Sequence, residues 1–86
     1  MLDVKEAARK ASEYFAGLYD AQASVLGDVQ LEEVELTDDG QYWLITLSYR
    51  PTTGLNLLGT SGRKYKVFKI DAGTGQVKSM KIRNVN

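Results

Sequence analysis

Residues 63–83 constrain the fold of this 86-residue chain more than any other part of its sequence. Two runs rich in β-branched and aromatic residues flank the short segment Asp71-Ala72-Gly73-Thr74-Gly75. Such runs are typical of pleated strands, and glycine supplies the positive φ that a tight reversal requires. The segment therefore predicts a β-hairpin, with strands over residues 64–70 and 76 to about 85.

A helical pattern at the start of the chain, over residues 3 to about 22, is the second constraint. Asp3 is placed to cap the first turn, and Glu6 follows at the spacing of a capping box. At 100° per residue, one stripe of the helix is mostly apolar and the opposite side is charged. The stripe consists of Val4, Ala8, Ala11, Phe15, Leu18 and Gln22, flanked by Ala7 and Tyr19. We expect its small alanines to let the helix approach a sheet closely.

Two more strands are predicted between the helix and the closing hairpin. Residues 29–37 form a strand whose alternation slips, so we expect a β-bulge near Glu32 and Glu33. An Asp38-Asp39-Gly40 turn leads into a strand over residues 41–50, which ends at Pro51. Trp43, Ile45, Leu47 and Tyr49 alternate along it and should face the helix. Thr46 and Ser48 should face the other way.

One helix followed by two hairpins predicts a single α+β domain over residues 1–86. The helix should cover one face of a four-stranded antiparallel meander, giving a two-layer sandwich. The length is sufficient for one domain and too short for two. A hydrophobic fraction of 43% is that of a folded globular domain.

The composition argues against catalysis. The chain contains no cysteine and no histidine, which removes thiol chemistry, the commonest general base and the commonest metal ligand. Carboxylates are available at Glu32, Glu33, Glu35, Asp38 and Asp39. We expect them to lie on a solvated strand and turn, where they serve solubility. The sequence therefore predicts a protein that is not an enzyme and that holds neither a metal nor a cofactor.

Charge is distributed unevenly along a chain whose net charge is zero. Residues 1–42 hold ten acids and three bases, whereas residues 43–86 hold eight bases and one acid, Asp71. We expect the acidic and basic strands to pair within one sheet. The alternative is a nucleic-acid surface, in which Lys64, Lys66 and Lys78, with Met80 and Ile82, share a face with Tyr42. Net neutrality and the acidic first hairpin favour the pairing within the sheet.

The chain resembles the PepSY domain family. The features that carry the resemblance are the alanine-rich leading helix, the acidic hairpin closed at Asp38-Asp39-Gly40, and the closing segment. In that segment, residues 65–77 follow the family's ending, a tyrosine–valine strand, an Asp-Ala turn with Thr-Gly, and a second strand. The resemblance implies a small α+β fold of cystatin-like appearance and a non-enzymatic role. It further implies a setting of peptidase pro-regions and the cell envelope, where an inhibitory role has been proposed.

The loop over residues 51–62 is the candidate contact surface. Leu55, Asn56, Leu57 and Leu58 lie there between glycines, where polar residues are expected. Twelve residues without secondary structure are many for a compact domain. Either the leucines fold back over the core, or they are exposed for a partner.

These observations predict a non-catalytic protein-interaction or regulatory module, with a peptidase as a candidate for the protein it modulates. Its partner would be another protein or a second copy of the chain. A nucleic-acid-binding domain that uses the basic closing hairpin is the alternative. No apolar run is long enough to span a bilayer, and the N-terminal residues do not form a secretory signal. We therefore expect a cytoplasmic protein, if Met1 is the native start.

Overall fold

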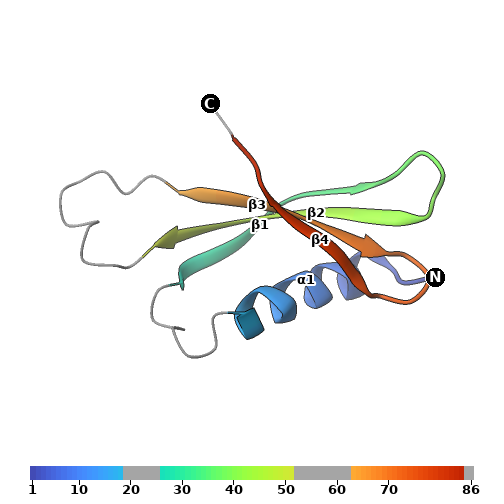
Figure 1. Ribbon diagram of the computed structural model, residues 1–86, viewed down its shortest axis with the longest axis horizontal. Coiled ribbons are helices and arrows are strands. Elements are labelled where there is room, and N and C mark those ends of the chain that lie inside the picture. The colour runs from blue at the N-terminus through green and yellow to red at the C-terminus, as the bar shows by residue number, and fades with distance from the viewer. Residues whose placement is uncertain (19–25, 52–62, 85–86) are drawn as a thin grey trace.

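The protein is one helix packed on a four-stranded antiparallel sheet, as the sequence predicts (Figure 1). The computed structural model describes residues 1–18, 26–51 and 63–84. The elements are α1 (Val4–Leu18), β1 (Leu26–Leu36), β2 (Tyr42–Pro51), β3 (Lys64–Asp71) and β4 (Val77–Ile82). The strands lie in the order β1-β2-β3-β4, so the sheet is a meander. We call the side of the sheet against α1 the helix face and the other side the open face.

The helix begins as predicted but is rotated from the predicted phase. The backbone N–H of Glu6 donates to Oδ1 of Asp3 at 2.8 Å, which confirms the cap. The buried residues are Ala7, Ala11 and Phe15, whereas Ala8 is half-buried and Val4 is exposed. Of the predicted stripe, Ala11 and Phe15 are buried as expected, but Val4 and Leu18 are exposed, and Ala7, predicted to flank the stripe, is buried. The three buried residues are spaced four apart. The methyl groups of Ala7 and Ala11 let the start of the helix lie close to the sheet, and the ring of Phe15 packs against the sheet at the other end. Residues 19–25 lie outside the described part of the chain.

The core lies between α1 and the two central strands. Ala7, Ala11 and Phe15 pack against Ile45, Leu47, Phe68 and Ile70, all of them buried. The ring of Phe15 meets those of Phe68 and Tyr49 edge-on, with centroids 5.7 and 5.1 Å apart. The alternation predicted for β2 is confirmed, since Trp43 and Tyr49 also pack against this cluster.

The first hairpin contains the predicted bulge. The β1–β2 register shifts between Leu31 and Glu33, where Leu31 lies opposite Leu47 and Glu33 lies opposite Thr46. The extra residue returns Val34 to the helix face, opposite Ile45. In the turn, Gly40 has a φ of 72°, which a residue with a side chain rarely adopts.

The second hairpin closes on Asp71. Its Oδ1 accepts hydrogen bonds from the backbone N–H groups of Gly73 and Thr74, at 2.8 and 2.9 Å. Gly75 then reverses the chain with a φ of 80°. These bonds hold the pKa of the Asp71 carboxyl below its ordinary value, because they favour the charged form. The last strand ends at Ile82, before the predicted limit near residue 85.

Candidate functional site

The two outer strands, β1 and β4, define the two edges of the sheet. In the described part of the chain, each pairs with one neighbour only, β1 with β2 and β4 with β3. An outer strand presents a row of backbone N–H and C=O groups that another strand can pair with. A strand from a partner would therefore bind at one of these two edges.

The helix leaves part of β1 uncovered. Leu31 and Val34 lie opposite Leu47 and Ile45, which belong to the core, so they too are on the helix face. Yet Leu31 is 53% exposed and Val34 is 43% exposed. The cause is the position of α1, whose buried residues pack against β2 and β3. An apolar strip thus lies along the outer strand.

Which backbone groups point outward follows from two hydrogen bonds. The N–H of Thr37 donates to the C=O of Tyr42, and the N–H of Arg83 donates to the C=O of Tyr65. In antiparallel strands, the backbone N–H and C=O groups of successive residues point alternately toward one neighbouring strand and away from it. Val34 on β1, an odd number of residues from Thr37, therefore points its N–H and C=O away from the sheet. By the same alternation, Ile82 on β4 does likewise.

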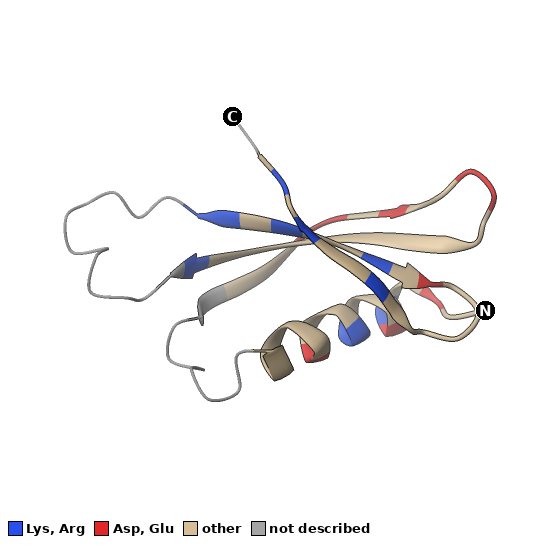
Figure 2. Cartoon of the chain, in the orientation of Figure 1, with Lys and Arg blue, Asp and Glu red and all other residues tan. Residues whose placement is uncertain are grey.

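The two outer strands carry opposite charges, acidic on β1 and basic on β4 (Figure 2). Glu33 and Glu35 project onto the open face from β1, since they lie opposite Thr46 and Leu44. Lys81 projects there from β4, opposite Val67, and Arg83 follows it. Acidic and basic strands are not neighbours, because β2 and β3 lie between β1 and β4. The predicted charge pairing therefore requires side chains that cross the sheet.

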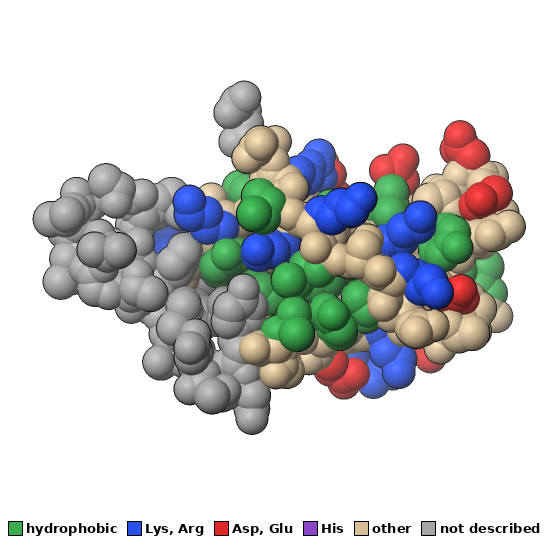
Figure 3. Space-filling view, in the orientation of Figure 1, with side chains coloured by type: hydrophobic (Ala, Val, Ile, Leu, Met, Phe, Trp, Pro, Cys, Tyr) green, Lys and Arg blue, Asp and Glu red, His purple; other side chains and the backbone are tan. Residues whose placement is uncertain are grey.

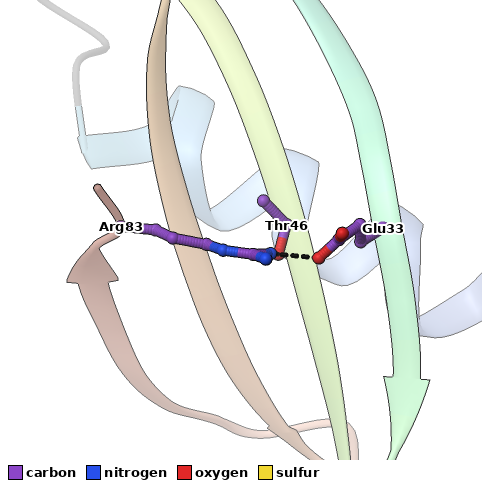
Figure 4. A network of polar contacts seen from close by, with 3 residues as sticks. All are labelled: Glu33, Thr46 and Arg83. Atoms are coloured by element: carbon purple, nitrogen blue, oxygen red, sulfur yellow. Dashed lines mark hydrogen bonds and ion pairs between the residues drawn. The ribbon is translucent and has the colours of Figure 1, made fainter. Parts of the chain in front are cut away.

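One arginine makes that crossing (Figure 4). Arg83 lies over the open face and forms an ion pair with Glu33, and its Nη1 donates to Oγ1 of Thr46 at 3.0 Å. The Glu33 carboxylate raises the pKa of Arg83, because it accepts a hydrogen bond from the guanidinium group and carries the opposite charge. Thr46 is 3% exposed although it belongs to the face without a helix. The charge pairing between acidic and basic strands is confirmed for this pair.

A second set of polar contacts, between Arg63, Ser48 and Glu32, lies beside the contacts of Arg83 with Thr46 and Glu33. Nε of Arg63 donates to Oγ of Ser48 at 2.9 Å, and Ser48 Oγ donates to Oε2 of Glu32 at 2.6 Å. A serine beside a carboxylate can serve as a nucleophile, but Ser48 is fully buried. Its hydroxyl group is out of reach of a substrate, so these contacts support the sheet.

A hollow of about 430 Å³ lies where β3 begins and the chain leaves β4. Figure 3 shows basic side chains along this side of the molecule, above an apolar area between α1 and β4. The hollow is lined by Tyr49, Arg63, Lys64, Tyr65, Lys66, Ile82, Arg83 and Asn84. Two of its four cations are already engaged, Arg83 with Glu33 and Arg63 with Ser48. The ion pair with Glu33 offsets one of the four positive charges, whereas the hydroxyl group of Ser48 is neutral and offsets none.

The two sites predicted from the sequence, the loop contact and the nucleic-acid face, have different outcomes. Leu55, Asn56, Leu57 and Leu58 lie outside the described residues. The predicted nucleic-acid face was wrong, because the register separates its members. Lys66 lies opposite Leu47 and Ile82 on the helix face, whereas Tyr42 lies on the open face, under the ammonium group of Lys69 at 4.3 Å. Among the described residues, no group of three or more acidic side chains is arranged to hold a metal ion.

Comparison of the chain with protein-family models, with curated proteins and with solved structures found no match in any of the three. The PepSY resemblance therefore stays a prediction. Within the described residues, no helix has the length and apolar character needed to cross a bilayer.

Proposed function

We propose that this protein is a non-catalytic interaction module that binds an extended segment of a partner protein along the outer edge of β1. The observation that carries the proposal is the uncovered strip on that strand. Leu31 and Val34 are apolar, about half exposed, and belong to a strand whose Val34 backbone groups point outward. Edge strands of folded domains are usually protected by charge, proline or a covering element, and among the described residues the helix face of β1 shows none of these beside Leu31 and Val34.

Strand addition uses what such an edge offers. The main-chain groups of the two strands supply the affinity, and alternate side chains supply the specificity. On the helix face, an incoming apolar side chain would cover Leu31 or Val34, and each would contribute about 1 kcal/mol from the half of its surface that is still exposed. On the open face, Glu33 and Glu35 would favour a basic residue.

The resemblance to the PepSY family suggests which partner to test first. It implies a non-enzymatic role connected with peptidases, so we propose a peptidase or its pro-region as the first class of partner. The segment Leu55, Asn56, Leu57 and Leu58 remains a second proposed contact.

A nucleic-acid function is favoured only by the basic hollow at the start of β3. Phosphate binding by lysine and arginine weakens steeply with salt. A gel shift with single-stranded oligonucleotides at low salt, repeated at higher salt, tests this alternative. We expect no shift, because Glu32 and Glu33 lie beside Tyr65 and Arg83, which also line the basic hollow, and their carboxylates would repel phosphate.

Photo-crosslinking tests the proposed function. With p-benzoylphenylalanine in place of Leu31, we expect discrete adducts with one protein from a lysate of the source organism. The same group in place of Val4, which is exposed on the helix, is the matched control and should give none. Adding Val34→Pro removes an outward N–H while leaving the bonds to β2 in place, so the adducts should disappear. Equal adducts from both positions, or none from Leu31, would contradict the proposal.

A further inference from the structure

We infer that the segment accepted by β1 is β4 of a second copy of this chain, in an antiparallel register that sets Val34 opposite Ile82. The inference rests on the proposed function, since it requires that β1 accepts a strand, and it names the partner. Four observations support it: strand direction, backbone phase, side-chain match, and the charge conflict that arises when either edge pairs with its own copy about Val34 or Ile82.

Strand direction comes first. In a four-stranded antiparallel meander, the first and fourth strands run in opposite directions. A second copy placed beyond β1 in the same orientation therefore brings its β4 antiparallel to β1. The sheet continues across the contact, and both helices lie on the same side of it.

The backbone groups of the two edges match in phase. The backbone N–H and C=O groups of Val34 and Leu36 point outward from β1, because the N–H of Thr37 points inward and donates to the C=O of Tyr42. Met80 and Ile82 point outward from β4, because Arg83 points inward to Tyr65. With Val34 opposite Ile82, Leu36 falls opposite Met80, and each pair can exchange two N–H···O bonds.

The side chains match on both faces in the same register. On the helix face, Val34 meets Ile82, which is 75% exposed in the single chain. On the open face, Glu33 falls opposite Arg83 and Glu35 falls opposite Lys81. Sliding β4 by two residues in either direction keeps the faces aligned but leaves a single acid–base pair. The register with Val34 opposite Ile82 is thus the best matched of the three.

Pairing either edge with its own copy about Val34 or Ile82 places like charges together. Two β1 edges paired about Val34 would set Glu33 against Glu35, and two β4 edges paired about Ile82 would set Lys81 against Arg83. Like charges directly opposite one another destabilise a pair of strands. Arg83 already neutralises Glu33 within each chain, so Glu35 with Lys81 is the pair that the contact newly forms. In the described part of the chain, Lys81 makes no ion pair.

Cysteine pairing tests the register, and the chain contains no cysteine of its own. Residues opposite each other in such a pair have Cα atoms about 5.5 Å apart, within the range of roughly 4.4–6.8 Å that a disulfide spans. We expect a 1:1 mixture of Val34→Cys and Ile82→Cys to give a disulfide-linked dimer under mild oxidation. The matched control mixes Val4→Cys with Ile82→Cys, since Val4 and Val34 are similarly exposed at 37% and 43%. It should give only the background of random collisions.

A charge exchange tests the same contact without a covalent bond. Glu35→Lys alone sets lysine against Lys81, and Lys81→Glu alone sets glutamate against Glu35. We expect each variant to associate at least about five-fold more weakly than the wild type in analytical ultracentrifugation. Mixed together they restore opposite charges at every contact, so the mixture should recover the wild-type association. A merely structural role for either residue would not produce this mutual rescue.

Each outcome decides between the alternatives. A dimer from Val34→Cys alone would show that two β1 edges pair, and the inference would be overturned. A mixture no more crosslinked than the Val4 control, with no rescue between charge variants, would overturn it as well. If photo-crosslinking from Leu31 then still marked a different protein, the proposed function would stand without self-association. If it marked nothing, both would fail.

Discussion

Arg83 and Glu33, fifty residues apart in sequence, form an ion pair across the open face of the sheet. Arg83 is the residue that follows β4, the strand at one edge of the sheet, and Glu33 belongs to β1, the strand at the other edge. Between them the Arg83 side chain lies over Thr46 and donates to its hydroxyl oxygen. One side chain thereby connects the first strand, the second strand and the end of the fourth.

Replacing Arg83 by leucine should lower the stability of the fold more than replacing Arg9 does. Arg9 pairs with Glu13 at 3.3 Å on the exposed helix surface, and such pairs contribute only about 0.3–0.5 kcal/mol. Arg83 also covers Thr46, so its loss leaves a buried hydroxyl group with one partner fewer. Urea unfolding of Arg83→Leu, Arg9→Leu, Glu33→Gln and the Arg83–Glu33 double variant provides the measurement. Strictly additive losses for Arg83 and Glu33 would contradict a coupled pair.

Gly75→Ala should destabilise the protein more than Gly40→Ala. Both glycines have a positive φ, 80° and 72°, where alanine costs roughly 1–2 kcal/mol. At Gly40 an added Cβ meets open space, whereas at Gly75 it would lie 3.0 Å from Cδ2 of Leu2 and 3.3 Å from Cε of Lys10. The two melting temperatures give the comparison directly. Equal shifts would mean that Leu2 moves aside without cost.

Thr37→Val should raise the pKa of Asp39. The Thr37 hydroxyl donates to Oδ1 of Asp39 at 2.7 Å, and this bond is the main reason that the Asp39 pKa lies below its ordinary value of 3.8. A carboxyl group with a lowered pKa stabilises the fold above pH 3.8, and this contribution is lost as the pH falls through the lowered value. Titration of the side-chain carboxyl carbon by NMR measures the change. Asp71 in the same spectrum is the internal control, because its own pKa is lowered by Thr74 and Gly73 instead.

Phe68→Ala should cost about 3–5 kcal/mol, because Phe68 is fully buried among core residues. Such a loss is comparable with the whole stability of many small domains, so the variant should be largely unfolded at room temperature. Ile82→Ala, at a side chain that is 75% exposed, should have little effect on the single chain. Circular dichroism during denaturation measures both. A large loss from Ile82→Ala that grows with protein concentration would indicate that the self-association contributes.

The sequence led to most of the fold because its signals are local. Asp3 and Glu6 mark the start of the helix, Gly40 and Gly75 mark the reversals, and the alternation in β2 identifies its core face. The bulge near Glu32 could also be read from the sequence, as a slip in alternation along one strand. Each of these signals depends on residues a few positions apart, whose preferences act before any long-range contact forms.

The candidate surface was harder to predict. The sequence directed attention to Leu55, Leu57 and Leu58, because apolar residues in a loop are conspicuous, whereas Leu31 and Val34 look like ordinary core positions of a strand. Leu31 and Val34 are more exposed than core residues only because the helix packs against β2 and β3 and leaves β1 uncovered. The one available signal was the pattern of glutamates between apolar residues on β1 and of lysines between apolar residues on β4.

By itself, the sequence determined the elements, their order and which residues of β2 face inward, since backbone preference and side-chain alternation are properties of short segments. Only the tertiary structure decided the rotation of α1, because the close fit of Ala7 and Ala11 against the sheet outweighs the broader apolar stripe. Only the tertiary structure placed Arg83 over Thr46 and Glu33, since that contact depends on the strand order. The uncovered edge of β1 follows from the same cause. One helix of fifteen residues is too narrow to cover four strands.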